Sequence, residues 1–257
     1  MERMSSTSLE TFFQEHPKAA VAFSGGTDSA FLLWAAKQYG CDVHAYHMST
    51  VFQPTFERED AQRLAAALSV PMTVIAFDIL SVPGAADNGP DRCYHCKRAL
   101  FTRLWQQARQ DGFPLLLDGT NASDDAEDRP GMRALRELEV RSPLRECGLT
   151  KDQVRNFSRS AGLFTWNKPA YACLATRIPT NTPLTEAALQ TIESAENALF
   201  QLGFSDFRIR LMAEGARLQV TEEQLELAVA KRAAVTAALK PFFPTVLLDL
   251  EARPAST

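Results

Sequence analysis

A glycine turn near the start of the chain combines residue types that bind anions. Ser24-Gly25-Gly26-Thr27-Asp28-Ser29 follows the apolar run Ala19–Phe23 and precedes an amphipathic run, so we expect a buried strand to end in a turn that opens a helix. The N–H groups at that helix start, its dipole and nearby serine hydroxyls would bind a phosphate. No Gly-Lys-Ser/Thr follows, so the turn differs from the Walker loop. We predict nucleotide contacts at Ser24, Gly25, Gly26, Asp28 and Ser29; the alternative is a tight turn that binds nothing.

Three cysteines have the spacing of a site for a metal or for sulfur chemistry. Cys93-Tyr94-His95-Cys96 lies between an expected strand and an expected helix, and Cys173 lies in a distant loop. A two-residue spacing lets both sulfurs of a pair contact one metal, and a third can come from elsewhere in the chain. Several alternatives stay open: a [4Fe–4S] cluster with one open iron, a zinc ion completed by His95 or water, and a redox pair or two ordinary thiols at the start of a helix. Cys41 and Cys147 have no such companions, and we expect both to be structural.

The elements that must position these residues alternate between strand and helix. Apolar runs at 19–23, 43–48, 72–77 and 115–117 alternate with helical patterns near 27–39, 55–69 and 94–111. This alternation predicts an α/β fold with a parallel sheet, whose ligands bind at the carboxyl ends of the strands. Met48 ends the second strand, where we expect the adenine, and a second glycine turn ends the fourth. We therefore add Met48, Gly119, Thr120 and Asn121 to the predicted nucleotide contacts.

The remainder of the chain predicts a second, smaller α/β domain. Residues 122–149 are polar and loop-rich, with an acidic run over 124–128 that we expect on a solvated face, and Thr150–Gln153 has the pattern of a capping box. Prolines punctuate 166–183. A long helix from 185, strands at 207–211 and 217–220, a helix at 221–239 and a strand at 246–250 are expected to follow. We therefore predict a nucleotide-binding domain with the cysteine site at 1–183 and a small α/β domain at 184–257.

Composition and charge restrict the possible partners. The 257 residues carry a net charge of −4 with 23% charged residues, and Lys and Arg form no cluster, so we do not expect a nucleic-acid substrate. No apolar run approaches the ~20 residues that span a bilayer, and the first residues lack a signal-peptide core. We therefore expect a cytoplasmic protein without a membrane partner.

Several further motifs follow the glycine turn in order along the chain. They are Cys93-Tyr94-His95-Cys96-Lys97, Asp118-Gly119-Thr120-Asn121-Ala122-Ser123-Asp124, Arg129-Pro130-Gly131-Met132-Arg133-Ala134-Leu135, Arg141-Ser142-Pro143-Leu144 and Lys168-Pro169-Ala170-Tyr171-Ala172-Cys173-Leu174-Ala175-Thr176-Arg177-Ile178-Pro179. With these motifs, residues from about 18 to 220 resemble the LarE family of PP-loop sulfur transferases. The PP-loop alone is shared with many ligases, whereas the segments around Cys173 and Gly131 are much more specific.

The resemblance implies synthesis of a thiocarboxylate for the nickel-pincer nucleotide cofactor of lactate racemase and related enzymes. ATP with Mg²⁺ would adenylate a carboxylate of pyridinium-3,5-biscarboxylic acid mononucleotide and release pyrophosphate, and sulfur would then displace AMP. In one branch of the family, a cysteine like Cys173 gives up its own sulfur and becomes dehydroalanine. In the other, three cysteines hold a [4Fe–4S] cluster that delivers sulfide from its open iron. Because the chain has Cys93, Cys96 and Cys173, the resemblance favours the cluster branch, with these three as ligands and catalytic residues.

The resemblance also points to a pair of arginines that would bind the phosphate of the substrate. Arg208 and Arg210 lie on a predicted strand, where the alternation of side chains places both guanidinium groups on one face. The alternative is a solvated strand face. Leu211–Gly215 stands where many relatives have His-Gly, and the tail Leu248–Pro254 lacks the Gly-Tyr-Arg run of the family. These departures concern the acceptor and the C-terminal contacts rather than ATP. The resemblance further suggests a homo-oligomer.

Three other functions are compatible with parts of this sequence. A tRNA thiolase of the PP-loop superfamily also pairs Cys-x-x-Cys with a cluster or persulfide, but it predicts a basic surface or an added RNA-binding module. Amidotransfer leaves the cysteines unexplained. A non-catalytic nucleotide-binding module with zinc predicts ATP binding without release of pyrophosphate. The combined motifs favour the sulfur transferase.

Overall fold

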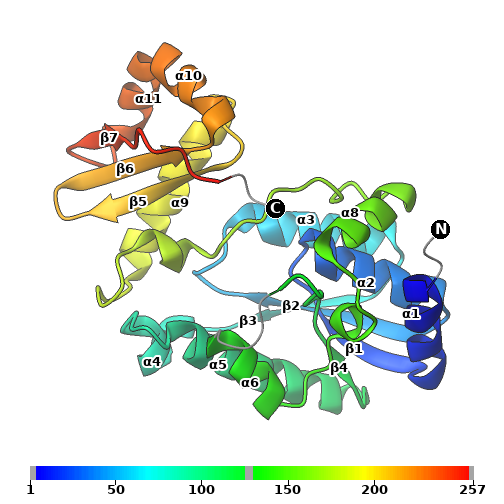
Figure 1. Ribbon diagram of the computed structural model, residues 1–257. Coiled ribbons are helices and arrows are strands. Elements are labelled where there is room, and N and C mark those ends of the chain that lie inside the picture. Colours follow the sequence, from blue (N-terminus) through cyan, green and yellow to red (C-terminus); the bar gives the residue numbers. More distant parts are fainter. Residues whose placement is uncertain (1–3, 125–129, 255–257) are drawn as a thin grey trace. The chain divides into compact units, whose positions relative to one another are not determined.

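The computed structural model describes residues 4–124 and 130–254, and its contacts divide the chain into two units (Figure 1). Unit 1 comprises Met1–Thr50, Thr55–Val82 and Asp91–Lys168, and unit 2 comprises Val51–Pro54, Pro83–Pro90 and Pro169–Thr257. The division after Lys168 precedes the boundary expected at residue 183. The loop that carries Cys173 belongs to unit 2 because its hydrogen bonds are made there; Leu174, for example, donates its N–H to the carbonyl of Phe52 at 2.8 Å.

Unit 1 is built on a four-stranded parallel sheet in the order β3-β2-β1-β4, which confirms the predicted α/β architecture. The strands are β1 (Lys18–Ala22), β2 (Asp42–Ser49), β3 (Met72–Ala76) and β4 (Leu116–Leu117). The helices are α1 (Met4–Glu15), α2 (Thr27–Gln38), α3 (Thr55–Ala67), the 3-10 turn η1 (Ile79–Ser81), α5 (Arg92–Gln110), α6 (Pro130–Glu137), α7 (Pro143–Glu146) and α8 (Lys151–Ser160).

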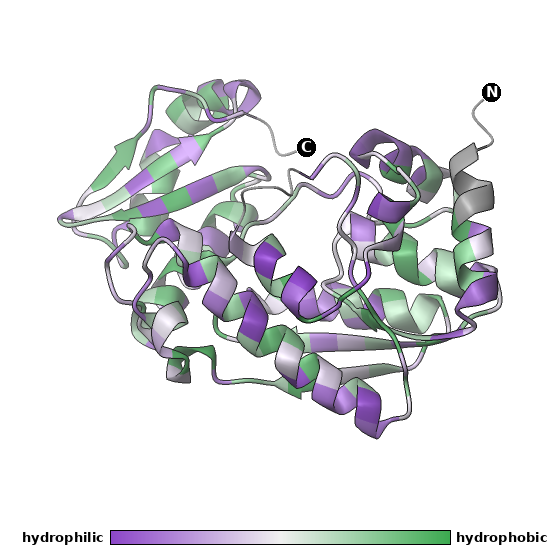
Figure 2. Ribbon diagram, turned by 60° about the horizontal axis from the view of Figure 1, so that its bottom comes forward, coloured by the Kyte–Doolittle hydropathy of each residue, from purple (hydrophilic) through white to green (hydrophobic). Residues whose placement is uncertain are grey.

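Alternate residues of the strands bury two separate apolar clusters, one on each face of the sheet. On β2, Val43 and Ala45 pack with α2 and α3, whereas Tyr46 and Met48 pack with Leu104 of α5 on the other face. Side chains of a strand alternate between faces, so burial on both sides requires this pattern. Hydrophobic and hydrophilic segments alternate along the helices (Figure 2).

Two parts of unit 1 differ from the expectations. Helix α1 is absent from the elements predicted from the sequence, although Leu9, Phe12 and Phe13 have helical spacing and bury their side chains. Residues 122–149 were expected to be loop, but Pro130 begins α6, where a proline is well tolerated because the first helical N–H needs no partner. Within this helix, Met132, Ala134 and Leu135 bury their side chains. Of the acidic run, Asp124 alone lies within the described residues.

Unit 2 contains a small mixed sheet in the order β5-β6-β7, packed on helices. Its elements are α4 (Pro83–Ala86), the 3-10 turn η2 (Leu174–Arg177), α9 (Glu186–Gln201), β5 (Phe207–Met212), β6 (Gly215–Val220), α10 (Glu222–Ala230), α11 (Arg232–Leu239) and β7 (Val246–Leu248). The helix expected at 221–239 is interrupted at Lys231, which ends α10 and precedes α11. Within the described ranges of both units, no helix is long and apolar enough to cross a membrane.

Candidate active site

The first glycine turn opens α2 and leaves its N-terminus without a side-chain cap. Gly26 is the N-cap residue and contributes no side chain, so the first N–H groups of α2 are available to an anion. Gly25 has a φ of 78°, and a Cβ at this position would lie 3.0 Å from the Cβ of Ala61 on α3. Only glycine combines this backbone conformation with so close an approach, because L side chains rarely adopt positive φ.

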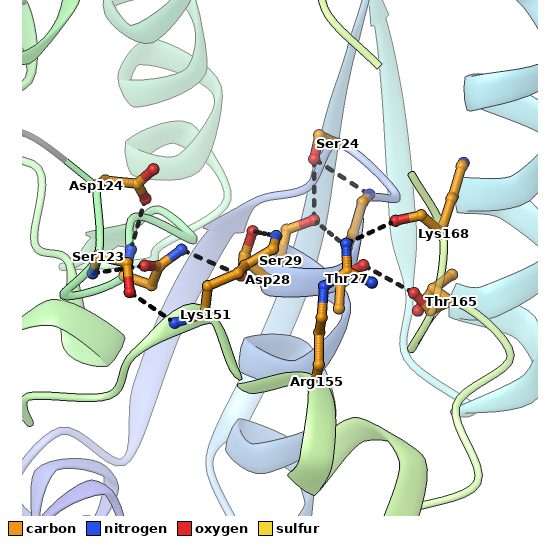
Figure 3. Close-up of polar contacts among 12 residues, drawn as sticks. Ser24, Thr27, Asp28, Ser29, Ser123, Asp124, Lys151, Arg155, Thr165 and Lys168 are labelled. Carbon is orange, nitrogen blue, oxygen red and sulfur yellow. Dashed lines mark hydrogen bonds and ion pairs between the residues drawn. The ribbon is translucent and has the colours of Figure 1, made fainter. Parts of the chain in front are cut away.

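Two serine hydroxyls hold the turn in shape. The Oγ atoms of Ser24 and Ser29 lie 3.0 Å apart, and Gly26 donates its N–H to Ser24 Oγ at 3.3 Å. Ser29 Oγ also lies 3.2 Å from the carbonyl oxygen of Gly26, to which it donates. Ser24, Gly26 and Ser29, three of the predicted nucleotide contacts, therefore form one connected hydrogen-bonded group at the start of α2 (Figure 3).

The second glycine turn packs directly against the first. A Cβ on Gly119 would lie 2.8 Å from the backbone nitrogen of Ser29, which no side chain tolerates. Asn121 donates from Nδ2 to the carboxylate of Asp28 at 3.3 Å, and Thr120 donates its hydroxyl to Asp118. The structure therefore brings Gly119 and Asn121 to the start of α2, as expected for parallel strands that end at one edge of a sheet.

Two lysines for which no role was predicted from the sequence form ion pairs with carboxylates of unit 1. Lys151, the first residue of α8, pairs with Asp28 at 2.6 Å, and the two side chains are only 17% and 23% exposed. Its backbone N–H donates to Ser123 Oγ at 3.0 Å. Lys168 pairs with Asp60 of α3 at 2.8 Å. The predicted capping box at Thr150 is present and makes Lys151 the first residue of α8. The position of this lysine at a helix start was therefore predictable from the sequence.

The segment that carries Lys168 is tied to α2 and α8. Thr27 donates its hydroxyl to the carbonyl of Thr165 at 2.7 Å. Arg155 donates to the carbonyl oxygens of Trp166 at 3.0 Å and of Lys168 at 3.2 Å (Figure 3). These bonds link residues 138, 11 and 13 positions apart, so no local sequence pattern predicts them.

Met48 and His47, both near the end of β2, make different contacts. Met48 is 5% exposed, and its side chain belongs to the apolar cluster on the α5 face, so its contact with adenine stays a prediction. His47, which the sequence analysis missed, is 1% exposed, and its Nδ1 lies 2.8 Å from the carbonyl oxygen of Phe23, directly before Ser24. Burial lowers the pKa of His47. The ring is therefore neutral near pH 7 and donates from Nδ1 to Phe23.

The paired cysteines lie in the first turns of α5. Cys93 is exposed and Cys96 is half-buried, and a spacing of three residues places both on one face of the helix. Helix α6 packs closely against this turn, since a Cβ on Gly131 would lie 2.9 Å from Cδ of Lys97 and 3.7 Å from the carbonyl oxygen of Cys93. Tyr94 donates its hydroxyl to Glu137 of α6 at 2.7 Å, which strengthens the same contact.

The third cysteine lies in unit 2, directly before η2. Its carbonyl oxygen accepts hydrogen bonds from the backbone N–H of Thr176 at 3.0 Å and from its hydroxyl at 2.8 Å. Arg177 donates to the carbonyl of Ala172 at 2.9 Å and pairs with Glu196 of α9 at 2.8 Å. Both partners of this ion pair are 1% exposed. Burial alone would lower the pKa of Arg177, but its hydrogen bonds and charge pairing with Glu196 raise it above the usual arginine value.

A metal site is not assembled within the part of the chain that the structure describes. No group of three or more His, Cys, Asp or Glu side chains there is arranged to hold a metal ion. Cys93 and Cys96 belong to unit 1 and Cys173 to unit 2. Cys93 and Cys96 share one face of α5, and the cluster stays a prediction. Cys41 donates its thiol to the carbonyl of His16 at 3.4 Å, and burial raises its pKa to about 11, as expected for a structural thiol.

The two predicted phosphate-binding arginines share one face of β5. Phe207 and Ile209, which alternate with them, are buried in the core of unit 2, so Arg208 and Arg210 lie on the opposite, polar face. Arg210 donates from Nε to Gln219 of β6 at 3.0 Å. The side-chain alternation expected from the sequence is therefore present.

Comparisons with known proteins identify related sequences. The family model described as queuosine biosynthesis protein QueC matches residues 18–86, which contain the first glycine turn. The chain is 33% identical over 210 residues to the pyridinium-3,5-bisthiocarboxylic acid mononucleotide synthase of Lactiplantibacillus plantarum, over 81% of this chain and 76% of that protein. It is 34% identical over 222 residues to an uncharacterized protein of Synechocystis, over 85% and 82% of the two chains.

A more distant similarity reaches another group of sulfur-inserting enzymes. The chain is 25% identical over 181 residues to a tRNA-specific 2-thiouridylase of Clostridium botulinum, over 58% of this chain and 51% of that protein. The similarity to the synthase spans most of both chains. The chain therefore belongs to the LarE family of PP-loop, ATP-dependent sulfur transferases.

Proposed function

We propose that this protein converts a carboxylate of pyridinium-3,5-biscarboxylic acid mononucleotide into a thiocarboxylate. A carboxylate oxygen attacks the α-phosphorus of ATP, pyrophosphate leaves, and an acyl-adenylate forms. A sulfur nucleophile then attacks the acyl carbon, and AMP leaves with the electron pair of the broken C–O bond. A carboxylate is a poor electrophile, so adenylation supplies the leaving group that sulfur can displace. The name of the Lactiplantibacillus relative supports this choice of substrate.

The observation that carries the proposal is the convergence of two glycine turns at the start of α2. Gly119 approaches Ser29 too closely for any side chain, and Asn121 hydrogen-bonds Asp28. This leaves a surface of backbone N–H groups and hydroxyls, which suits the triphosphate of ATP. Such preformed donors stabilise the charge on the departing pyrophosphate without reorganising during the reaction.

Charged residues around the turns would complete the ATP site. Lys151 and Lys168 are cations held by carboxylates, and the phosphates of ATP would compete for them. Asp28, which pairs with Lys151 here, would then be free to hold Mg²⁺ through an oxygen ligand. Mg²⁺ would neutralise the phosphate oxygens and orient the leaving group.

The sulfur would be supplied at the three cysteines. We propose that Cys93, Cys96 and Cys173 hold a [4Fe–4S] cluster, which when bound supplies a sulfide nucleophile at its open iron. The exposure of Cys93 and the shared helix face of Cys93 and Cys96 support this assignment. The close packing of Gly131 against Lys97 and the backbone of Cys93 would keep that face in place.

Release of pyrophosphate tests the first half of the reaction. With ATP and Mg²⁺, we expect pyrophosphate to appear only when the pyridinium mononucleotide is added, because its carboxylate is the nucleophile. Pyrophosphate release that does not depend on the mononucleotide, or that requires unmodified tRNA instead, contradicts the proposed substrate. Lys231→Ala, a change on the surface of unit 2, serves as the control variant and should leave the rate unchanged.

Elemental analysis tests the second half. Protein purified without oxygen should contain about four irons and four sulfides per chain, and Cys93→Ala should lose them. Stoichiometric zinc contradicts the cluster. Loss of one sulfur from the mass of Cys173 after a single turnover contradicts it as well, and indicates that Cys173 donates its own sulfur.

A further inference from the structure

His47 is a buried titratable side chain that takes no part in the proposed chemistry. It lies near the end of β2, and its Nδ1 atom lies 2.8 Å from the carbonyl oxygen of Phe23, the residue directly before the first glycine turn. Burial, and to a smaller extent the charge of Arg58, lower the pKa of His47, whereas the hydrogen bond to Phe23 raises it. The neutral ring donates from Nδ1, because a carbonyl oxygen only accepts.

This hydrogen bond extends the pairing of β1 with β2 by one residue beyond the strand. The register of the two strands ends with Ala22 opposite Tyr46. Phe23 then donates its backbone N–H to the carbonyl of Tyr46 at 2.8 Å, and its own carbonyl accepts from the side chain of His47. Both backbone polar groups of Phe23 are therefore fixed to β2 at the point where the chain leaves the sheet.

The carbonyl of Phe23 and the N–H of Ser24 belong to one planar trans peptide unit and point in opposite directions. A carbonyl held towards β2 therefore aims the N–H of Ser24 to the β4 side of β1. Ala20, which has the same parity on β1, shows this direction, since its N–H donates to the carbonyl of Leu115 directly before β4 at 2.8 Å. Strand β4 continues into the second glycine turn at Gly119, so the N–H of Ser24 faces the place where the two turns converge. Within the part of the chain that the structure describes, this N–H has no acceptor.

We propose that His47 is a positioning residue of the ATP site, which aims the N–H of Ser24 at the phosphates through the peptide plane that this N–H shares with the carbonyl of Phe23. A donor that is held in place before the anion binds needs no reorganisation when it binds. Without the imidazole, the buried carbonyl of Phe23 would lack its partner, and rotation of the peptide plane towards another donor would turn the N–H of Ser24 away. The inference rests on the proposed function in that it takes ATP as the anion.

Two substitutions of His47 separate the hydrogen bond from the bulk of the ring. Binding of ATP with Mg²⁺ and of adenosine to the full-length protein is measured by titration calorimetry. His47→Leu fills much of the space without a donor and should weaken ATP binding by roughly 10-fold, with adenosine unchanged. His47→Asn places its amide Nδ2 where the ring has Nδ1 and should recover most of the lost ATP affinity. The smaller Asn side chain leaves a cavity, so a merely structural role of His47 predicts that His47→Asn binds ATP no better than His47→Leu.

His44→Leu is the matched control, because His44 lies on the same strand and loses a hydrogen bond of its own, to Thr73 Oγ1 at 2.8 Å. It should bind ATP and adenosine like the wild type. The positioning role is refuted if His47→Leu binds ATP as tightly as His44→Leu does, or if it loses affinity for adenosine in the same proportion; the proposed function then stands. If His47→Leu loses ATP affinity selectively while the wild type releases no pyrophosphate with the pyridinium mononucleotide, the proposed substrate fails and the positioning role stands. If the wild type does not bind ATP, both fail.

Discussion

Breaking the buried ion pair between Arg177 and Glu196 should strongly reduce the free energy of unfolding. Both side chains are 1% exposed, and Glu196 also accepts the N–H of Ile209 at 3.1 Å and the hydroxyl of Tyr171. Replacing Glu196 by Gln removes one charge with little change of shape and leaves Arg177 buried without its counter-charge. Removal of one partner from a buried pair costs about 3–5 kcal/mol. In a chain of this size that lowers the melting temperature by roughly 10 °C.

The measurement is thermal unfolding followed by circular dichroism, with Glu226→Gln as control because Glu226 is exposed on α10. A double variant that removes both charges, Arg177→Met with Glu196→Gln, should regain much of the lost stability, because no unpaired charge remains and the amide oxygen can still accept the N–H of Ile209. Equal melting temperatures for Glu196→Gln and Glu226→Gln would refute the reasoning. Because Arg177 also bonds the carbonyl of Ala172, Glu196→Gln should additionally speed alkylation of Cys173.

Four further predictions follow from unit 1. Gly119→Ala should weaken ATP binding by roughly 10-fold or more, because the new methyl group meets the backbone of Ser29; Gly89→Ala, which has open space around it, should bind ATP normally in the same titration. Lys151→Met should slow release of pyrophosphate by about 10²-fold, whereas Lys37→Met on the surface of α2 should not. Burial lowers the pKa of His47 below its usual 6.5. The stability that the neutral ring contributes is therefore fully present above pH 6.5 and is lost as the pH falls through the lower pKa of the folded state. Denaturation midpoints measured against pH should decline less steeply towards acid pH in His47→Gln. In protein freed of metal by a chelator, iodoacetamide should modify exposed Cys93 well before Cys41, whose pKa is about 11; equal rates by peptide mass spectrometry would contradict the assigned burial.

The parallel sheet and its glycine turn were predictable because their signals are local. Apolar runs of strand length, a Ser-Gly-Gly turn and a capping box each depend on residues within a few positions of one another. The alternation on β5 was likewise predictable, since the strand places Arg208 and Arg210 on one face whatever the rest of the chain does. Helix α1 was missed because its few buried apolar residues stand among polar ones without a clear start signal.

The parts of the site that escaped prediction depend on contacts between distant residues. Lys151 meets Asp28, and Lys168 meets Asp60, across more than a hundred positions of sequence. His47 reaches Phe23 because β1 and β2 are neighbours in the sheet. A motif identifies residues, whereas the fold decides which charges lie close enough to interact.

The most direct test of the account is the mass of the product. The anaerobically purified protein is incubated with ATP, Mg²⁺ and pyridinium-3,5-biscarboxylic acid mononucleotide, and the small molecules are analysed by mass spectrometry. The account predicts a mononucleotide in which sulfur replaces one carboxylate oxygen, with AMP and pyrophosphate formed in equal amounts. An unchanged mononucleotide beside intact ATP, although both bind to the protein, would contradict it.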